Sequence, residues 1–297
     1  MPNTGKIALR RRLKVIHNPT SGGSSNLFVA TLNKLKEMNI HCDVQATQKP
    51  GEGTFIARTA STQGGYDGVV AAGGDGTCNE VARGLFGSVM PMGILPTGTA
   101  NVLAIEMGLK FTATFLAQTL AFGHSTPVYL GQTKDRIFLL MAGAGFDARV
   151  VADVSKTMKV NLGKGAYVLM AIKHLFSTPP GRIEVEVEGK VFEAGWVLVC
   201  NAAHYGGRFR IAPKADLRKP GFQVLIFDHR TVLSKFASIL GLILGRSKLG
   251  GGYQVLYGNR IRLGGQPGEP FQIDGDAAGT LPQEISIAPS SLNLIFP

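Results

Sequence analysis

The chain has 297 residues, of which 44% are apolar, so it is expected to fold into two domains rather than remain disordered. A formal net charge of +11 favours a polyanionic partner, and charge alone leaves nucleic acid, an anionic membrane and a phosphorylated substrate open. Cys42, Cys78 and Cys200 have no metal or redox spacing, which argues against a zinc site and indicates a reduced, cytosolic protein. No apolar run approaches the roughly 18 residues of a membrane span, so a soluble or peripheral protein is expected.

Up to residue 122, short β-like runs alternate with helical patterns. This alternation is typical of a parallel sheet whose strands are joined by crossover helices. The predicted strands cover residues 13–17, 40–47, 68–72 and 92–95, and the predicted helices cover 26–38, 54–62, 100–107 and 111–122. The first part of the chain is therefore predicted to be an α/β domain.

After His124 the pattern changes to paired extended segments, and a hairpin-like turn is expected at Gly189-Lys190. The predicted strands cover 127–132, 137–142, 182–188, 191–199, 222–227, 254–263, 271–273, 284–287 and 292–296. Helical patterns interrupt them at 146–158, 165–176 and 231–244. The second half is therefore predicted to be mostly β.

A glycine-rich segment follows the predicted strand 68–72, and a helical pattern begins directly after it. The segment reads Gly73-Gly74-Asp75-Gly76-Thr77. Glycine lets the backbone approach phosphate oxygens, and the following helix N-terminus offers unpaired amide donors. Asp75 would repel a triphosphate unless Mg²⁺ or a hydroxyl proton stood between them, so it indicates chemistry on Mg²⁺-bound ATP. Walker and dinucleotide spacings are absent, and the alternative is an ordinary glycine turn.

Two further turns follow predicted strands of the same sheet, and Thr47 ends another strand. The turns read Asn18-Pro19-Thr20-Ser21-Gly22-Gly23 and Pro96-Thr97-Gly98-Thr99-Ala100-Asn101. Carboxyl ends of parallel strands meet at one edge of the sheet, so these hydroxyls and amides are expected to converge on phosphate and ribose groups. Taken singly, each turn could instead be a helix cap.

In this order, the motifs resemble the diacylglycerol kinase catalytic-domain family, which includes bacterial lipid kinases and sphingosine kinases. The resemblance covers nearly the whole chain and rests on residues 18–22, 73–77 with Asn79 and Glu80, 95–101, 143–147, 212–213 and 274–276. It implies an α/β ATP-binding domain with a parallel sheet over 1–125 and a β-sandwich lipid-substrate domain over 126–290. Residues 291–297 are expected to form a C-terminal strand that can return to the first domain. The active site is expected in the cleft between the two domains.

The resemblance implies an ATP-dependent lipid kinase that transfers the γ-phosphate to a hydroxyl of diacylglycerol or of a sphingoid base. It would be a cytoplasmic enzyme, peripheral at an anionic membrane surface, with a lipid substrate and no nucleic-acid partner. Mg²⁺ is expected with ATP, near Asp75, without an assigned set of metal ligands. The residues expected to bind ATP are Asn18, Pro19, Thr20, Ser21, Gly22, Thr47, Gly73, Gly74, Asp75, Gly76, Thr77, Cys78, Asn79, Glu80, Thr97, Gly98, Thr99 and Asn101.

The family's general base is a carboxylate in an Asp-Gly-Glu segment, which here reads Asp274-Gly275-Asp276. Asp276 is therefore expected to be a catalytic residue. Asp75, in the glycine-rich turn, is the other expected catalytic residue. The Asp276 carboxylate reaches less far than glutamate by about 1.5 Å, and it can still accept a proton from a hydroxyl aligned on the γ-phosphate. The alternative is a simple turn residue beside Gly275.

Three other features bear on this resemblance. Pro220-Gly221 replaces an Asp-Gly that the family uses to hold a structural Mg²⁺, so that site is not assigned, although Asp216 lies nearby in the sequence. Asp147 matches an aspartate of the family's cleft, and its alternative is a first-turn acid of a helix. The basic amphipathic segment 231–249 can lie on an anionic membrane or pack on the β domain.

Two other functions stay open from the sequence. A soluble NAD kinase is one, because that related family also has a GGDG turn on a two-domain fold. A catalytically weak protein that binds lipid or nucleotide is the other, and Asp276 and Pro220 motivate it.

Overall fold

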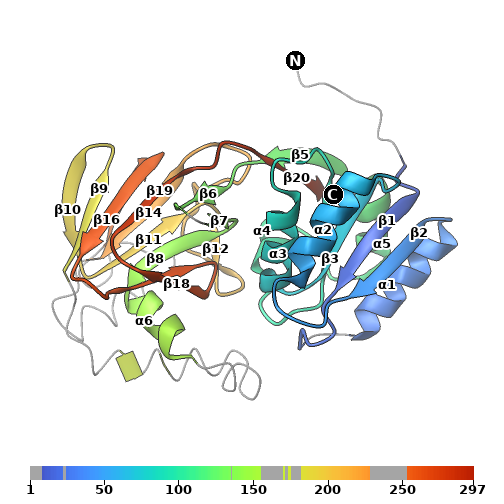
Figure 1. Cartoon of the computed structure of the whole chain (residues 1–297), viewed down its shortest axis with the longest axis horizontal. Helices are drawn as coiled ribbons and strands as arrows, with labels where there is room; N and C mark the ends of the chain where they lie inside the picture. Colours follow the sequence, from blue (N-terminus) through green and yellow to red (C-terminus); the bar gives the residue numbers. More distant parts are fainter. Residues whose placement is uncertain are drawn as a thin grey trace. The chain divides into compact units, whose positions relative to one another are not determined.

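The computed structural model describes residues 9–22, 25–134, 136–154, 170, 173–174, 182–227 and 253–297. The chain divides into two compact units: unit 1 contains residues 1–128 and 290–297, and unit 2 contains residues 129–289 (Figure 1). Unit 1 has an α/β fold with a mainly parallel sheet, and unit 2 contains antiparallel sheets packed as a β-sandwich. The predicted fold class is therefore confirmed.

Unit 1 is built on a six-stranded sheet in the order β2-β1-β3-β4-β20-β5. Its strands are β1 (Arg12–His17), β2 (His41–Ala46), β3 (Gly68–Gly73), β4 (Met92–Pro96), β5 (His124–Val128) and β20 (Leu292–Phe296). The first four are parallel, and β20 is parallel to β4 and antiparallel to β5. Every residue of β3 is buried, as expected for a central strand covered on both faces.

Helices cover this sheet, and their apolar residues form its core. They are α1 (Ser25–Glu37), α2 (Glu52–Gln63), α3 (Asp75–Leu85), α4 (Val102–Glu106) and α5 (Ala113–Phe122). Helices α1 and α5 pack together over the sheet face that carries Leu13, Val15 and Val70. Helices α2 and α3 pack against each other. Because α3 starts two residues after β3 ends, its N-terminus lies directly at the edge of the sheet.

Unit 2 contains two six-stranded antiparallel sheets and a short hairpin. One sheet has the order β10 (Lys190–Ala194), β9 (Ile183–Val187), β16 (Arg260–Gly265), β19 (Gln283–Ile287), β6 (Gly131–Gln132) and β7 (Ile137–Phe138). The other has the order β15 (Gln254–Gly258), β14 (Phe222–Phe227), β11 (Trp196–Cys200), β8 (Met141–Gly145), β17 (Pro270–Ile273) and β18 (Asp276–Thr280). The hairpin is β12 (His204–Tyr205) with β13 (Phe209–Arg210).

The core of unit 2 lies between these two sheets. Strand β9 alternates buried and less buried residues, and its Val185 shares a cluster with Val199 of β11 and Phe271 of β17. Strands β11 and β14 are buried throughout. Their second faces pack in a separate cluster that includes Trp196, Phe227 and the segment around Ile211.

One helix of unit 2, α6 (Phe146–Asp153), follows β8 and packs against β17. It corresponds to the first part of the predicted helix 146–158. The predicted helix 165–176 falls almost wholly outside the described residues, and the amphipathic segment 231–249 does so completely. Across the part of the chain that is described, no helix has both the length and the apolar character needed to span a bilayer.

Candidate functional site

The three predicted phosphate-binding turns follow adjacent parallel strands whose register brings their carboxyl ends together. His17 of β1 is paired with Ala72 of β3, and Gly73 of β3 is paired with Pro96 of β4. The pairing continues into the turns: the Asn18 N–H donates to the Ala72 carbonyl at 2.9 Å, and the Thr97 N–H donates to the Gly73 carbonyl at 3.0 Å. The strand register therefore places all three turns at one edge of the sheet.

Side chains connect the three turns directly. The Asn18 amide Nδ2 donates to the Thr77 hydroxyl at 3.3 Å. The Ser21 and Thr97 hydroxyls lie 3.0 Å apart and share a hydrogen bond. The Asn18 Oδ1 also accepts from the Thr20 N–H at 3.0 Å, which closes the first turn on itself. The structure thus brings together polar residues that are far apart in the sequence, as the convergence of strand ends requires.

Glycine is required by close packing at two of these positions. A Cβ on Gly98 would clash with the Cα of Gly74, and a Cβ on Gly73 would clash with the Thr77 side chain. A Cβ on Gly76 would meet nothing within 4 Å, and this residue is exposed in the first turn of α3. The chain therefore needs no glycine for packing at position 76, where the helix N-terminus faces solvent and offers amide donors.

The Asp75 carboxylate is used within unit 1. Its Oδ1 accepts the Leu103 N–H at 3.0 Å at the start of α4. Burial raises the pKa of Asp75 above its ordinary value, and hydrogen bonds from backbone N–H groups, Leu103 foremost, oppose that shift. Asp75 therefore orders the third turn in addition to any contact with a ligand.

Other predicted nucleotide contacts also have structural partners. Glu80 accepts the N–H groups of Gly51 and Gly53 at 2.7 and 3.0 Å, before and within the first turn of α2. The Asn101 side chain bonds to both backbone groups of Gly98, which closes the third turn. Both side chains act as braces for the site.

The remaining residues predicted to contact the nucleotide differ in their exposure to solvent. Pro19, Thr20, Gly22 and Thr99 are exposed, whereas Gly74, Thr47 and Asn79 are half-buried. The Thr47 N–H donates to the His17 carbonyl at 2.8 Å, which places Thr47 beside the end of β1. Cys78 is buried, so its thiol is not accessible to a ligand in solution.

In unit 2 the predicted base lies on the turn between β17 and β18. The Asp274 carboxylate accepts the N–H groups of Leu139, Leu140 and Met141, each at 2.8 Å. Asp276 is exposed and is the first residue of β18. Asp274 is not among the individual site residues predicted from the sequence. The sequence feature that could have identified Asp274 is an aspartate directly before a glycine in a turn. Aspartate tolerates the left-handed backbone conformation, which Asp274 adopts at φ +50°.

Asp147 lies in the first turn of α6 and is buried. Its Oδ1 accepts from the indole N–H of Trp196 at 2.8 Å, and its Oδ2 accepts from the Gln272 amide at 2.9 Å. Burial raises the pKa of Asp147 to about 7, although both hydrogen bonds favour the ionised form. It is therefore a carboxyl group that titrates near neutral pH inside unit 2.

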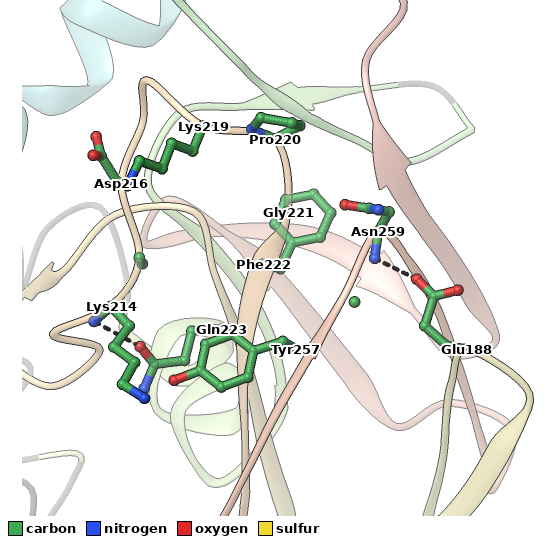
Figure 2. A pocket seen from close by; sticks show the side chains of 12 residues that line it. Glu188, Lys214, Asp216, Lys219, Pro220, Gly221, Phe222, Gln223, Tyr257 and Asn259 are labelled. Atoms are coloured by element: carbon green, nitrogen blue, oxygen red, sulfur yellow. Dashed lines mark hydrogen bonds between the residues drawn. The ribbon is translucent and has the colours of Figure 1, made fainter.

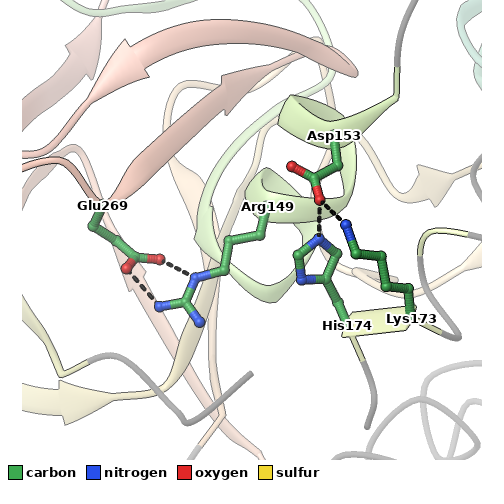
Figure 3. Close-up of polar contacts among 5 residues, drawn as sticks. All are labelled: Arg149, Asp153, Lys173, His174 and Glu269. Atoms are coloured by element: carbon green, nitrogen blue, oxygen red, sulfur yellow. Dashed lines mark hydrogen bonds and ion pairs between the residues drawn. The ribbon is translucent and has the colours of Figure 1, made fainter. Parts of the chain in front are cut away.

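Helix α6 has further polar contacts along its length (Figure 3). The Arg149 guanidinium makes a two-pronged ion pair with Glu269, at 2.8 and 2.6 Å. Near the end of the helix, Asp153 bonds to Lys173 at 2.8 Å and to His174 at 3.0 Å. Of these, the Arg149–Glu269 pair fastens α6 to the start of β17, because Glu269 directly precedes that strand.

The segment that would hold the family's structural Mg²⁺ does not fit that ion in this chain. The Asp216 carboxylate is bound by the Arg218 guanidinium at 2.9 and 3.1 Å and by the Arg218 N–H at 3.0 Å. Pro220 offers no carboxylate. Among the described residues, no group of three or more His, Cys, Asp or Glu side chains has the arrangement of a metal site.

The same segment lines a pocket in unit 2 (Figure 2). Lys214, Asp216, Lys219, Tyr257 and Asn259 are among its lining residues. The pocket lining contains neither Asp276 nor any residue predicted to bind ATP. The pocket is therefore separate from the predicted catalytic residues.

Asp147 makes stability depend on pH. The pKa of this carboxyl is raised from 3.8 to about 7 on folding, so its contribution to stability is full below pH 3.8 and is lost as pH rises through about 7. Asp147→Asn removes this titration. We expect the melting temperature of the wild type, relative to that of the variant, to fall between about pH 4 and pH 8 in thermal denaturation scans. A difference that stays constant across this range would contradict the raised pKa.

Comparison with known proteins agrees with this architecture. Residues 12–133 match the model of the Diacylglycerol kinase catalytic domain, and residues 141–296 match that of the YegS C-terminal NAD kinase beta sandwich-like domain. A diacylglycerol kinase of Bacillus subtilis (strain 168) is 28% identical over 296 residues, covering 97% of each chain. A diacylglycerol kinase of Staphylococcus carnosus (strain TM300) is 27% identical, covering 92% of this chain and 91% of its own.

Solved structures share the fold. A chain from Bacillus anthracis str. Sterne superposes with a TM-score of 0.81 at 20% identity, covering 100% of this chain and 98% of its own. A diacylglycerol kinase from the same strain superposes with a TM-score of 0.72 at 17% identity, covering 97% of each chain. At such identities the likeness concerns the fold alone. With both family models matched in order, the chain belongs to the diacylglycerol kinase catalytic-domain family, with the YegS-type C-terminal domain.

Proposed function

We propose that this protein is an ATP-dependent lipid kinase that transfers the γ-phosphate of ATP to a lipid hydroxyl. The observation that carries the proposal is the convergence of three glycine- and threonine-rich turns at the N-terminus of α3, in a chain of a kinase family. Family membership supports a phosphotransferase. That the phosphate donor is ATP and that the acceptor is a lipid hydroxyl are the two further parts of our proposal.

The phosphates would lie against the first turn of α3. Its backbone N–H groups and its dipole favour an anion, and the exposed Gly76 lets phosphate oxygens approach the backbone closely. Thr99 is exposed in the third turn, and its hydroxyl can donate to a phosphate or ribose oxygen. Unit 1 thus offers donors from three strand ends to one polyphosphate.

Mg²⁺ bound with ATP would supply neutralisation of the phosphate charge. Asp75 in the glycine-rich turn and Glu80 in α3 are the carboxylates among the predicted nucleotide contacts, and both accept backbone N–H groups. Mg²⁺ in kinases normally keeps several water ligands and takes one or two carboxylates besides the phosphates, and Asp75 would be the protein's contribution. This fits a site with few acidic side chains.

The acceptor chemistry would use unit 2. The lipid hydroxyl oxygen forms a bond to the γ-phosphorus as the bond to the β-phosphate oxygen breaks, and ADP leaves. The hydroxyl proton passes to the Asp276 carboxylate, which is exposed at the start of β18. The turn that carries Asp276 is anchored by the three N–H bonds to Asp274. Such anchoring is useful because phosphoryl transfer depends mainly on positioning.

Radiolabelled ATP tests the proposal directly. We expect the purified protein to label diacylglycerol or a sphingoid base from [γ-³²P]ATP in mixed micelles. We also expect faster labelling in vesicles with anionic lipid than in neutral vesicles, because the net charge is +11.

NAD is tested as an acceptor in a parallel reaction, since the family model matched by residues 141–296 is described as NAD kinase beta sandwich-like. Labelled NADP without labelled lipid would assign the NAD kinase function instead.

Gly76→Ala separates nucleotide binding from folding. The new methyl group meets no protein atom within 4 Å, so the melting temperature should not fall. It would stand between the backbone and a phosphate, so the Kd for ATP should rise roughly tenfold. Calorimetric titration measures the Kd, and Asn33→Ala on the exposed face of α1 is the matched control. An unchanged Kd in Gly76→Ala would contradict the placement of phosphate at this turn.

Substitution of Asp276 tests the base. Asp276→Asn should lower kcat by about 100-fold or more, because the carboxylate that accepts the proton is lost, while the Kd for ATP stays the same. Asp276→Glu keeps a carboxylate that can accept the proton, so its kcat should lie well above that of Asp276→Asn. Rates are measured with saturating lipid. A wild type without turnover that gains it in Asp276→Glu would instead identify a catalytically weak binding protein.

A further inference from the structure

A buried chain of hydrogen bonds links α6 to the turn that carries Asp276. The Trp196 indole N–H donates to Asp147 Oδ1 at 2.8 Å, and the Gln272 Nε2 donates to Asp147 Oδ2 at 2.9 Å. The other end of the Gln272 amide, Oε1, accepts the Gly275 N–H at 2.9 Å. Gly275 directly precedes Asp276 in the sequence. The Asp147 carboxylate is therefore linked to the turn by hydrogen bonds through one side chain, that of Gln272.

The direction of every bond in this chain is determined by chemistry. The indole nitrogen of Trp196 can only donate. The Gly275 N–H can only donate as well, so Gln272 must present its oxygen to Gly275 and its NH₂ group to Asp147. Both oxygens of Asp147 consequently face donors. The ionised carboxylate can accept from every one of these donors, whereas a proton on either oxygen would compete with one of them.

The turn needs this support. Asp274 and Gly275 both have positive φ, at +50° and +83°, and a non-glycine residue pays about 1 kcal/mol or more for the left-handed region. Asp274 is held from one side by the N–H groups of residues 139–141. Gly275 is held from the other side by Gln272. The direction in which Asp276 leaves the turn depends on both fastenings.

We propose that Asp147 is a positioning residue for phosphoryl transfer: in its ionised form it orients Gln272, which holds the Gly275 peptide and so places the Asp276 carboxylate. This inference rests on the proposed role of Asp276 as the base. Asp147 and Gln272 are both buried, at 3% and 2% exposure, so they act from behind the turn and through Gly275.

Positioning by Asp147 makes turnover depend on pH. The groups that face Asp147 are the Trp196 indole from β11, the Gln272 amide from β17 and, on α6 itself, the backbone N–H groups of Asp147 and Ala148. The charged groups on the neighbouring elements have partners of their own. These pairs are Arg149 with Glu269, Asp153 with Lys173 and His174, and Asp274 with the N–H groups of residues 139–141.

Protonation of Asp147 at Oδ2 would make this oxygen a donor toward Gln272, which favours the reversed amide and removes the bond from the Gly275 N–H to the Gln272 oxygen. Because burial raises the pKa of Asp147 to about 7, kcat should fall as the pH is lowered through about 7. KM for ATP should not follow this change, since the nucleotide turns belong to unit 1.

A swap of polarity tests the relay in the full-length protein. Asp147→Asn presents an NH₂ group to the Gln272 NH₂ group, and Gln272→Glu presents a carboxylate to the Asp147 carboxylate. Each single variant should lower kcat about tenfold to 100-fold without changing KM for ATP.

The double variant, Asp147→Asn with Gln272→Glu, restores the pairing with its polarity reversed. The amide introduced at position 147 donates to the carboxylate introduced at position 272, and that carboxylate still accepts from the Gly275 N–H. The double variant should recover kcat to within about threefold of the wild type. A double variant as slow as the single variants would contradict the relay.

Glu269→Gln is the matched structural control. It weakens the Arg149–Glu269 pair, the other polar fastening between α6 and the start of β17 (Figure 3), and leaves the Gln272–Gly275 bond in place. We expect it to lower the melting temperature and to leave kcat within about twofold of the wild type. A loss of kcat equal to that in the Asp147 variant would show that general loosening of α6 is the cause, and would overturn the positioning role.

Hydrogen exchange of the Gly275 amide supplies a readout that does not depend on activity. NMR of protein labelled with ¹⁵N-glycine should show faster exchange in both single variants and wild-type exchange in the double variant. Unchanged exchange in the single variants would overturn the relay, as would faster exchange with unchanged kcat. If the wild type phosphorylates no lipid, the proposed function fails, and the exchange measurement still decides whether Asp147 holds the turn.

Discussion

The parallel register of β1, β3 and β4 is the constraint on which the candidate nucleotide site depends. Residues 18–22, 73–77 and 96–101 are separated by as many as about eighty positions in the chain, yet the register ends all three strands at one edge. The hydrogen bonds between Asn18 and Thr77 and between Ser21 and Thr97 are consequences of that register. A slip of one strand would separate these side chains.

Two carboxylates in unit 1 serve the architecture of the turns as well as the chemistry proposed for them. Asp75 organises the start of α4, and Glu80 organises the start of α2. The glycines at positions 73 and 98 are required by close packing, whereas position 76 has free space above it. Gly76 is therefore the glycine of this motif that packing does not explain, and its free space suits the approach of a phosphate.

In unit 2, support for the candidate base comes from behind the turn. Asp274 is held by three backbone N–H groups, and Gly275 is held by Gln272. Asp216 illustrates the opposite case, because its carboxylate is taken by Arg218 within the same loop. A local ion pair thus occupies the acid that a metal would need, which agrees with the presence of Pro220 in the same loop.

Sequence patterning by itself determined the fold class, because strand and helix periods and glycine-rich turns are local properties of the chain. The order of the motifs indicated the family by resemblance. Patterning also named Asp75, Asn18 and Thr97 as neighbours, since parallel strands must share an edge. Their roles as ligands of ATP stay predictions. Only the tertiary structure decided that Asp147 meets Trp196 and Gln272, and that Asp274 binds residues 139–141. Those contacts join residues up to 135 positions apart, and no local pattern encodes them.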